Sequence, residues 1–372
     1  MRERDDAQTL ADSFRRFAIY AARDGAPRYE RICDGVADDP DLLDIVDAAP
    51  PDQRRPNILL AAVHYLLLLG VDDPLARHYP TVACLKGCAP DPDPPAGELF
   101  GAFRSFCLAR REAIVDLVSG RATQTNEVGR CSAIYPAVAS VGQRVGKPLA
   151  VVDLGAAAGL NLLFDRFCYD YGGIERGAPG SPVRLACDLR SGTLPAWEPE
   201  VACRLGLDRR PVDVRDGDSA LWLLACQWPD HLDRFTTARD AIRFARELAD
   251  YPEVVGGDIV HDLLGVVARL PSSPHLCLYQ TWAGAYLTPS EQEALAENVA
   301  TIARARPVSW IYAETPHEVP SLAMPPPPGP VVKGATAVVL VDAGPGAREP
   351  EVLRLADMHS HGRWLEWYGA DG

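Results

Sequence analysis

The stretch VVDLGAAAGLNLLFDRF (residues 151–167) places an acid, Asp153, two residues before a run of small residues. An apolar segment leads to Asp153, five small residues follow from Gly155 to Gly159, and a helix-like pattern resumes at Leu160. In an open α/β sheet, ligands bind beyond the carboxyl ends of the strands, where backbone amides and helix N-termini face them. We therefore expect a ligand to approach the backbone of this loop.

The loop lacks the spacing of the common nucleotide-binding loops. The dinucleotide pattern GxGxxG, started at Gly155, would need glycines at the positions of Ala157 and Leu160. No Lys-Ser or Lys-Thr pair follows, as a phosphate-binding P-loop would require. A tight strand-to-helix turn also needs small residues, so the loop alone leaves a purely structural role open.

The segment from Asp153 to Gly159 resembles motif I of the class I S-adenosylmethionine-dependent methyltransferases, an acid followed by GxGxG, with Ala157 at the middle glycine. The resemblance implies that the loop passes under the methionyl part and the ribose of S-adenosylmethionine. The cofactor-binding residues that we predict are Asp153, Gly155, Ala156, Ala157, Gly159, Asn161, Asp188, Asp258 and Gln280.

Two later acids fall at the ends of predicted strands. Asp188 ends the second strand, 183–189, where a carboxylate can accept both ribose hydroxyls. Asp258 ends the third, 253–259, where the resemblance implies a contact to the adenine amino group. Either acid alone could instead cap a helix. Three acids at three successive strand ends are harder to explain as caps.

The segment TNEVGR (125–130) begins a predicted helix, 126–143. Its length of about 27 Å matches the roughly 26 Å of an eight-residue strand, so antiparallel packing on the first strand returns its N-terminus to the ligand edge. Asn126, Glu127 and Arg130 would then overhang the loop, beside an acceptor pocket between the helical region and the sheet. A capped, solvated helix start is the alternative.

Arg130 would pair with a carboxylate of the cofactor or of an acidic acceptor through two parallel hydrogen bonds. We expect Arg130→Lys to weaken ligand binding and to leave the thermal stability of the ligand-free protein nearly unchanged.

Methyl transfer needs a base only if the acceptor carries a proton at pH 7. Glu127 and Glu314 are the candidate catalytic residues. Gln280 and Trp282 end a further strand on the same edge, and Trp282 joins Asn126 at the rim of the site.

We predict no metal site. His359 and His361 share a face if their segment is a strand, but the sequence offers no identifiable third ligand. The ten cysteines include no CxxC pair and are interpreted as reduced thiols, mostly in the core.

The predicted secondary structure that positions these residues changes near residue 145, from helices alone to alternating strands and helices. Residues 1–145 show helical spacing and no convincing alternating strand, which predicts a helical N-terminal region. From 146 to 372, apolar β-type runs alternate with helical ones, which predicts an α/β domain with a doubly wound parallel sheet. Residues 190–237 are too long for a normal connection and are predicted to be an insertion. The runs ATAVVLVD and HGRWLEWYG are expected to pair as a C-terminal antiparallel hairpin.

A wider similarity covers most of the chain, from about residue 10 to 368. The segment TNEVGRCSAIYPAV and the loop that follows it, together with PNILLAAVHYLLLLG and WPDHLDR, resemble the bacterial domain-of-unknown-function family 2332 (DUF2332). The resemblance implies a class I methyltransferase-like (Rossmann-like) fold and S-adenosylmethionine as cofactor, but no particular substrate.

Composition excludes several classes of partner. With 37 Lys and Arg against 51 Asp and Glu, the net charge is −14, which disfavours nucleic acid and anionic membrane surfaces. The N-terminus MRERDDAQTL lacks the apolar core of a secretory signal, so we expect a cytoplasmic protein. We predict a methyltransferase acting on a small-molecule acceptor; the alternative is a non-catalytic S-adenosylmethionine-binding or regulatory protein that retains the fold.

Overall fold

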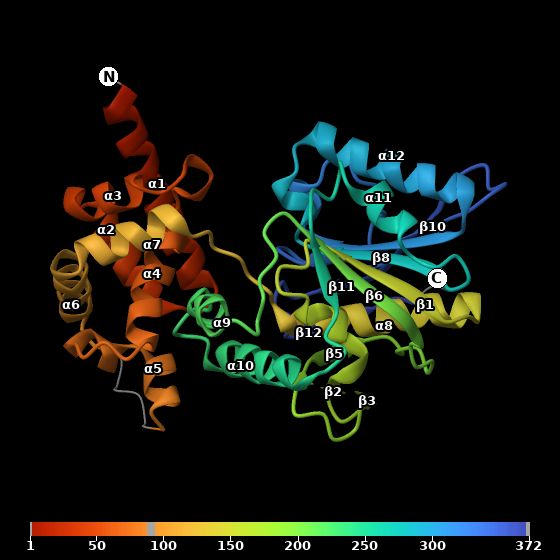
Figure 1. The fold of residues 1–372 in the computed structure, drawn as a ribbon, viewed down its shortest axis with the longest axis horizontal. Coiled ribbons are helices and arrows are strands. Elements are labelled where there is room, and N and C mark those ends of the chain that lie inside the picture. The colour runs from red at the N-terminus through yellow and green to blue at the C-terminus, as the bar shows by residue number, and fades with distance from the viewer. Residues whose placement is uncertain (1, 88–93, 370–372) are drawn as a thin grey trace. The chain divides into compact units, whose positions relative to one another are not determined.

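The computed structural model describes residues 2–87 and 94–369, and the chain forms two compact units (Figure 1). Unit 1 contains residues 1–125 and 215–239, and unit 2 contains residues 126–214 and 240–372. The first division lies at 125 rather than at 145 because the helix that follows belongs with the sheet. The segment 215–239 belongs to unit 1 because its tryptophans pack there: the rings of Trp222 and Tyr65 are 5.6 Å apart, and those of Trp228 and Phe17 are 5.1 Å apart.

Unit 1 is helical around one apolar core. Its helices are α1 (Arg2–Arg23), α2 (Pro27–Ala37), α3 (Pro40–Asp47), η1 (Pro51–Gln53), α4 (Pro56–Leu68), η2 (Pro74–His78), α5 (Pro80–Leu85), α6 (Ala96–Ala109), α7 (Arg111–Gly120) and α9 (Gly217–Ala225), and α10 (Leu232–Glu247) continues into unit 2. Proline opens α2, α3, α4 and α5, where its missing N–H leaves no hydrogen bond unmade. Helix α4 is buried over most of its length, which accounts for its long apolar run.

Unit 2 is built on a sheet. Its strands are β1 (Leu149–Leu154), β2 (Cys168–Asp170), β3 (Glu175–Gly177), β4 (Arg184–Ala186), β5 (Asp188–Ser191), β6 (Val201–Asp208), β7 (Glu253–Gly256), β8 (His275–Thr281), β9 (Val308–Glu314), β10 (Thr336–Ala343), β11 (Glu351–Met358) and β12 (Trp364–Trp367). Its other helices are η3 (Val128–Arg130), α8 (Cys131–Val145), η4 (Leu160–Arg166), α11 (Leu263–Ala268), η5 (Gly284–Tyr286), α12 (Pro289–Ala305) and η6 (Pro316–Glu318).

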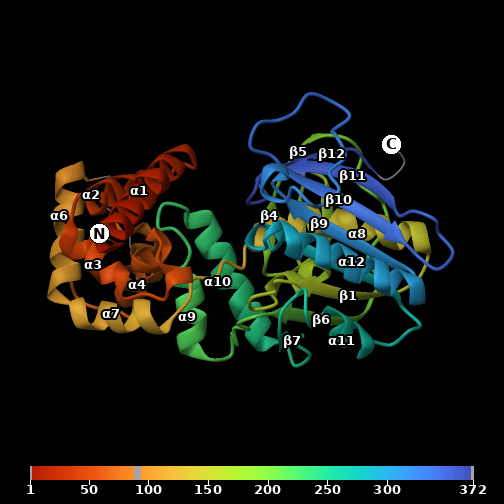
Figure 2. The same ribbon diagram turned by 90° about the horizontal axis from the view of Figure 1, so that it is seen from above.

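The main sheet runs in the order β5-β12-β11-β10-β9-β8-β1-β6-β7, as Figure 2 shows from above, and a small second sheet has the order β3-β2-β4. The strands from β7 to β9 are all parallel, whereas β10 is antiparallel to β9 and to β11. Helices α11 and α12 lie over one face of the main sheet and α8 over the other (Figure 1). Unit 2 is thus a mixed α/β structure with a large, mostly parallel sheet.

Two features of the predicted topology are wrong. Residues 190–237 are not a single insertion, because they contain β6, which pairs directly with β1. The two C-terminal runs do not pair with each other, because β11 lies between β10 and β12. In both places a strand with several polar or charged residues was missed.

The elements beside the loop follow the sequence more closely. The predicted helix 126–143 is present as the short η3 followed by α8, which ends at Gly146 with φ +59°. The helix-like pattern that resumes at Leu160 is instead the 3-10 helix η4 followed by β2.

Candidate functional site

Asp153 lies at the carboxyl end of β1, in the middle of the sheet. Its backbone pairs with Gly206 of β6 and Tyr279 of β8. The side chain is 3% exposed, and its Oδ2 atom has no hydrogen-bond partner among the described residues. Burial raises the pKa of this carboxyl well above its ordinary value, Asp208 raises it further, and Arg130 lowers it. Buried polar atoms nearly always have a partner, so this oxygen marks a place where a ligand could donate a hydrogen bond.

The small residues after β1 fit a crowded turn. Gly155, Ala157 and Gly159 have φ values of +84°, +50° and +78°, a region that favours glycine. A Cβ atom on Gly155 would lie 2.8 Å from Ala283 Cβ, and one on Gly159 would lie 2.8 Å from Val254 Cγ2. Packing alone therefore explains the two glycines, and the unpartnered acid is the stronger sign of a ligand.

Asp208 ends β6, the strand beside β1, and was missed in the sequence. Its Oδ2 accepts a hydrogen bond from the N–H of Ala157 at 2.8 Å, and its Oδ1 accepts one from the N–H of Arg210 at 2.8 Å. The signal in the sequence was the run VACRLGLD, a β-type segment that ends in an acid. Asp208 holds the loop at the residue with the positive φ of +50°.

Asp188 does not lie at the end of a strand beside β1. It begins β5, the outermost strand of the sheet next to β12, and its N–H donates to Arg363 O at 2.9 Å. Its side chain is exposed. The acid at the end of the strand beside β1 is Asp208.

Asp258 follows β7 and caps the next turn. Its Oδ1 accepts from the N–H groups of Val260 and His261 at 2.8 and 3.0 Å, and its Oδ2 accepts from Arg209 Nε at 2.7 Å. Burial raises the pKa of Asp258, but the hydrogen bonds from His261, Val260 and Arg209 outweigh it and lower the pKa to about 2. Asp258 therefore caps the turn 259–262, whereas the N-cap of the following helix α11 is Asp262, and Asp258 lies at the carboxyl edge of the sheet.

Arg130, in η3, is held by backbone carbonyls. Its Nε donates to Ser360 O at 3.0 Å and its Nη1 to Thr281 O at 3.2 Å. The guanidinium lies 5.3 Å from the ring centre of Trp282, whose φ of +59° is rare for a bulky residue. Arg130 thus joins the start of α8, the end of β8 and the turn before β12.

Glu314 and Gln280 form a buried pair at the ends of β9 and β8. Glu314 Oε1 accepts from Gln280 Nε2 at 3.0 Å and from the N–H of Gly284 at 2.8 Å. Both side chains are 0% exposed, and Glu314 Oε2 and Gln280 Oε1 have no hydrogen-bond partner in the described part of the chain. Burial raises the pKa of Glu314 to about 7, against the opposing hydrogen bonds from Gly284 and Gln280.

Glu127 meets His361, a contact that sequence reasoning missed. Glu127 Oε2 lies 3.2 Å from His361 Nδ1, and Glu127 Oε1 accepts from the N–H of Gly129 at 3.3 Å. His361 lies in the turn between β11 and β12, and its N–H donates to His359 Nδ1 at 3.1 Å. The carboxylate is 4% exposed, so Glu127 is part of a buried ion pair when His361 is protonated.

The two predicted asparagines bind protein groups. Asn126 Oδ1 accepts from the N–H of Leu160 at 3.0 Å, so it lies beside the loop as the helix geometry predicts. Asn161 Oδ1 accepts from Cys131 Sγ at 3.4 Å, which joins η4 to the start of α8.

Comparison with protein families gives a match over nearly the whole chain. The profile of a family described as "Uncharacterized protein conserved in bacteria (DUF2332)" matches residues 11–367. The chain belongs to the DUF2332 family. No curated protein shows a significant sequence match to it.

In this DUF2332 protein, the ends of β1, β6, β8 and β9 bring together Asp153, Asp208, Gln280 and Glu314, with Arg130 beside them. Asp188 lies apart, on the edge strand. Within residues 2–87 and 94–369, no three His, Cys, Asp or Glu side chains are grouped as metal ligands. None of the helices described is both long and apolar enough for a membrane span.

Proposed function

We propose that unit 2 binds S-adenosylmethionine at the carboxyl edge of β1, β6 and β8, and that the protein is a methyltransferase for a small-molecule acceptor. The observation that carries the proposal is the buried Oδ2 of Asp153, which has no hydrogen-bond partner within the described residues and lies two residues before the start of the small-residue loop at Gly155. A cofactor with an amino group could satisfy that oxygen.

The topology of the parallel strands supports the proposal. Taken in chain order, β1, β6, β7, β8 and β9 occupy the sheet as β7-β6-β1-β8-β9, the 3-2-1-4-5 order of doubly wound nucleotide-binding sheets. The order reverses between β1 and β8, and ligands of such sheets bind at this reversal. We therefore interpret unit 2 as Rossmann-like and similar to class I methyltransferases.

Roles for the edge residues follow from their positions. Asp153 would hold the methionyl amino group, and Asp208 would accept from ribose hydroxyls, because a carboxylate has about four acceptor sites. Gln280 Oε1, which likewise has no hydrogen-bond partner in the described segments, would accept a further donor of the ligand. When bound, S-adenosylmethionine supplies an electrophilic methyl group.

Glu314 is the better of the two candidate bases. A pKa of about 7 lets the carboxylate accept a proton from an acceptor near neutral pH. Its Oε2 has no partner in the regions described, whereas Glu127 is paired with His361.

A non-catalytic S-adenosylmethionine-binding protein is the second candidate. Arg130, Asn126 and Asp258 make hydrogen bonds within the protein. Few side chains at the site are therefore assigned to binding a methyl acceptor, and this favours the non-catalytic candidate.

Calorimetric titration tests cofactor binding. We expect the wild-type protein to bind S-adenosylmethionine and its demethylated product, and Asp153→Asn to weaken binding at least about tenfold. Asp250→Asn, which alters an exposed ion pair with Arg166, is the matched control and should bind normally. Absence of heat with either compound, on folded wild-type protein, would remove the proposal.

Transfer of label separates the two candidates. The protein is incubated with a bacterial metabolite extract and methyl-labelled cofactor, and products are separated by chromatography. Label in a small molecule that is lost with Glu314→Gln supports the enzyme. Cofactor binding without any labelled product supports the non-catalytic alternative.

A further inference from the structure

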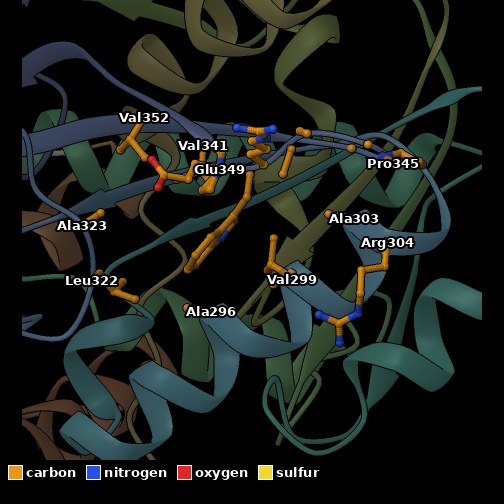
Figure 3. Close-up of a pocket in the computed structure, with 18 of the residues that line it drawn as sticks. Ala296, Val299, Ala303, Arg304, Leu322, Ala323, Val341, Pro345, Glu349 and Val352 are labelled. Atoms are coloured by element: carbon orange, nitrogen blue, oxygen red, sulfur yellow. The ribbon is translucent and has the colours of Figure 1, made fainter.

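A cavity lies within unit 2, on the face of the sheet that α12 covers. It has a volume of about 460 Å³, and α12, β9, β10 and the segment 343–350 enclose it (Figure 3). This volume is in the range of small-molecule sites in proteins, roughly 300–1,000 Å³. Side chains that line it include Val299, Ala303, Leu322 and Val341.

The cavity is separate from the carboxyl edge of the sheet. Trp310, which lines it, lies four residues before Glu314 on β9, about 13 Å along the strand. Its backbone pairs with Val341 of β10, and the neighbouring Val308 pairs with Ala343, where the segment 343–350 begins. The inference therefore does not depend on the proposed function.

Trp310 gives the cavity one specific polar feature. The side chain is 3% exposed, and its Nε1 atom has no hydrogen-bond partner among the residues described. An indole N–H can only donate, and buried donors nearly always have an acceptor. The neighbouring Tyr312 hydroxyl already donates to Ala323 O, so it does not compete for the same acceptor.

A water molecule is a poor partner for this donor. A buried water needs two to four polar contacts, whereas the wall is largely made of alanine, valine, glycine and proline residues. The charged residues that line the cavity, Arg304, Arg348 and Glu349, are all exposed, and Arg304 and Glu349 lie on opposite sides of it (Figure 3).

We propose that this cavity binds an apolar organic molecule with one hydrogen-bond acceptor, which receives the N–H of Trp310. The apolar body fills the space between α12 and the sheet, and the acceptor group satisfies the buried donor.

Binding of 8-anilino-1-naphthalenesulfonate to the full-length protein tests the site, because this probe joins an apolar ring system to a strong acceptor. We expect a saturable rise in its fluorescence. Trp310→Phe keeps the aromatic volume, removes the donor and should weaken binding about three- to tenfold. Trp197→Phe, the same change at a side chain that does not line the cavity, should have no effect.

Substitutions that fill the cavity provide a second test of the proposal. Val299→Trp and Ala303→Phe each place a large side chain in the space and should abolish binding, with folding checked by circular dichroism. In an indole ¹H-¹⁵N spectrum, the resonance that is lost in Trp310→Phe should move downfield when the probe binds. The proposal would be overturned if the fluorescence of the probe did not rise with the wild-type protein. It would also be overturned if the folded variants bound the probe as well as wild type does and the Trp310 indole resonance did not move.

Discussion

The buried carboxyl group of Glu314 makes the stability of unit 2 depend on pH. Burial raises its pKa from the ordinary 4.5 to about 7. Between these values the folded protein keeps a proton that the unfolded chain has lost, so the free energy of unfolding falls as pH rises through this window. The loss amounts to about 3 kcal/mol at most.

We therefore expect Glu314→Gln to remove part of the decrease in stability between pH 5 and pH 8, measured by urea unfolding. Asp153 titrates in the same direction but is present in both proteins, so the difference between them reports on Glu314. Glu293→Gln, at an exposed position, is the control. Equal slopes for Glu314→Gln and wild type would contradict the assigned pKa.

Arg130 contributes to stability before any ligand binds. Its guanidinium donates to Ser360 O and Thr281 O, two carbonyls that a lysine ammonium could not reach with the same geometry. We now expect Arg130→Lys to lower the stability of the ligand-free protein by about 1–3 kcal/mol, contrary to the expectation from sequence. Arg190→Lys, which changes an exposed arginine over Trp364, should cost less than about 1 kcal/mol in the same thermal unfolding assay. An unchanged melting temperature for Arg130→Lys would restore the original expectation.

At the scale of elements, the loop after β1 contains a strained residue. Ala157 has φ +50°, which costs an alanine about 1–2 kcal/mol. Glycine relieves this strain, so Ala157→Gly should be at least about 1 kcal/mol more stable than Ala158→Gly, whose buried alanine lacks a positive φ. Chemical denaturation of both variants measures the difference. Equal losses would mean that Ala157 carries no strain.

The turn between β11 and β12 packs directly against η3. A Cβ atom on Gly362 would lie 1.9 Å from Gly129 O, and Gly362 has φ +75°. Gly180 has φ +84° but open space around it. Both alanine variants incur the cost of placing alanine at a positive φ. In Gly362→Ala the turn and η3 must also move apart, so this variant should lose about 1–3 kcal/mol more unfolding free energy than Gly180→Ala. Similar melting temperatures would show that the turn moves without cost.

At the scale of the whole molecule, the proposed cofactor should protect only certain segments of unit 2. Hydrogen exchange with and without S-adenosylmethionine should slow in residues 153–160, 206–210 and 280–284, which meet at the carboxyl edge of the sheet. Helices α2 to α4 of unit 1 serve as the internal control and should exchange unchanged. Protection confined to segment 343–350 would instead place the compound in the cavity lined by Trp310.

Features that depend on local periodicity can be predicted from the sequence. The buried run of β1, the acid and small residues after it, and the helix 126–143, present as η3 and α8, can be identified from neighbouring residues alone. Which strand lies beside β1 is clear only from the folded sheet, and with it the finding that Asp208 rather than Asp188 ends next to Asp153. The fold also brings Glu127 against His361 from the far end of the chain. Strand order and contacts between distant residues depend on which arrangement buries all the apolar faces of the chain together. A local sequence pattern does not contain this information.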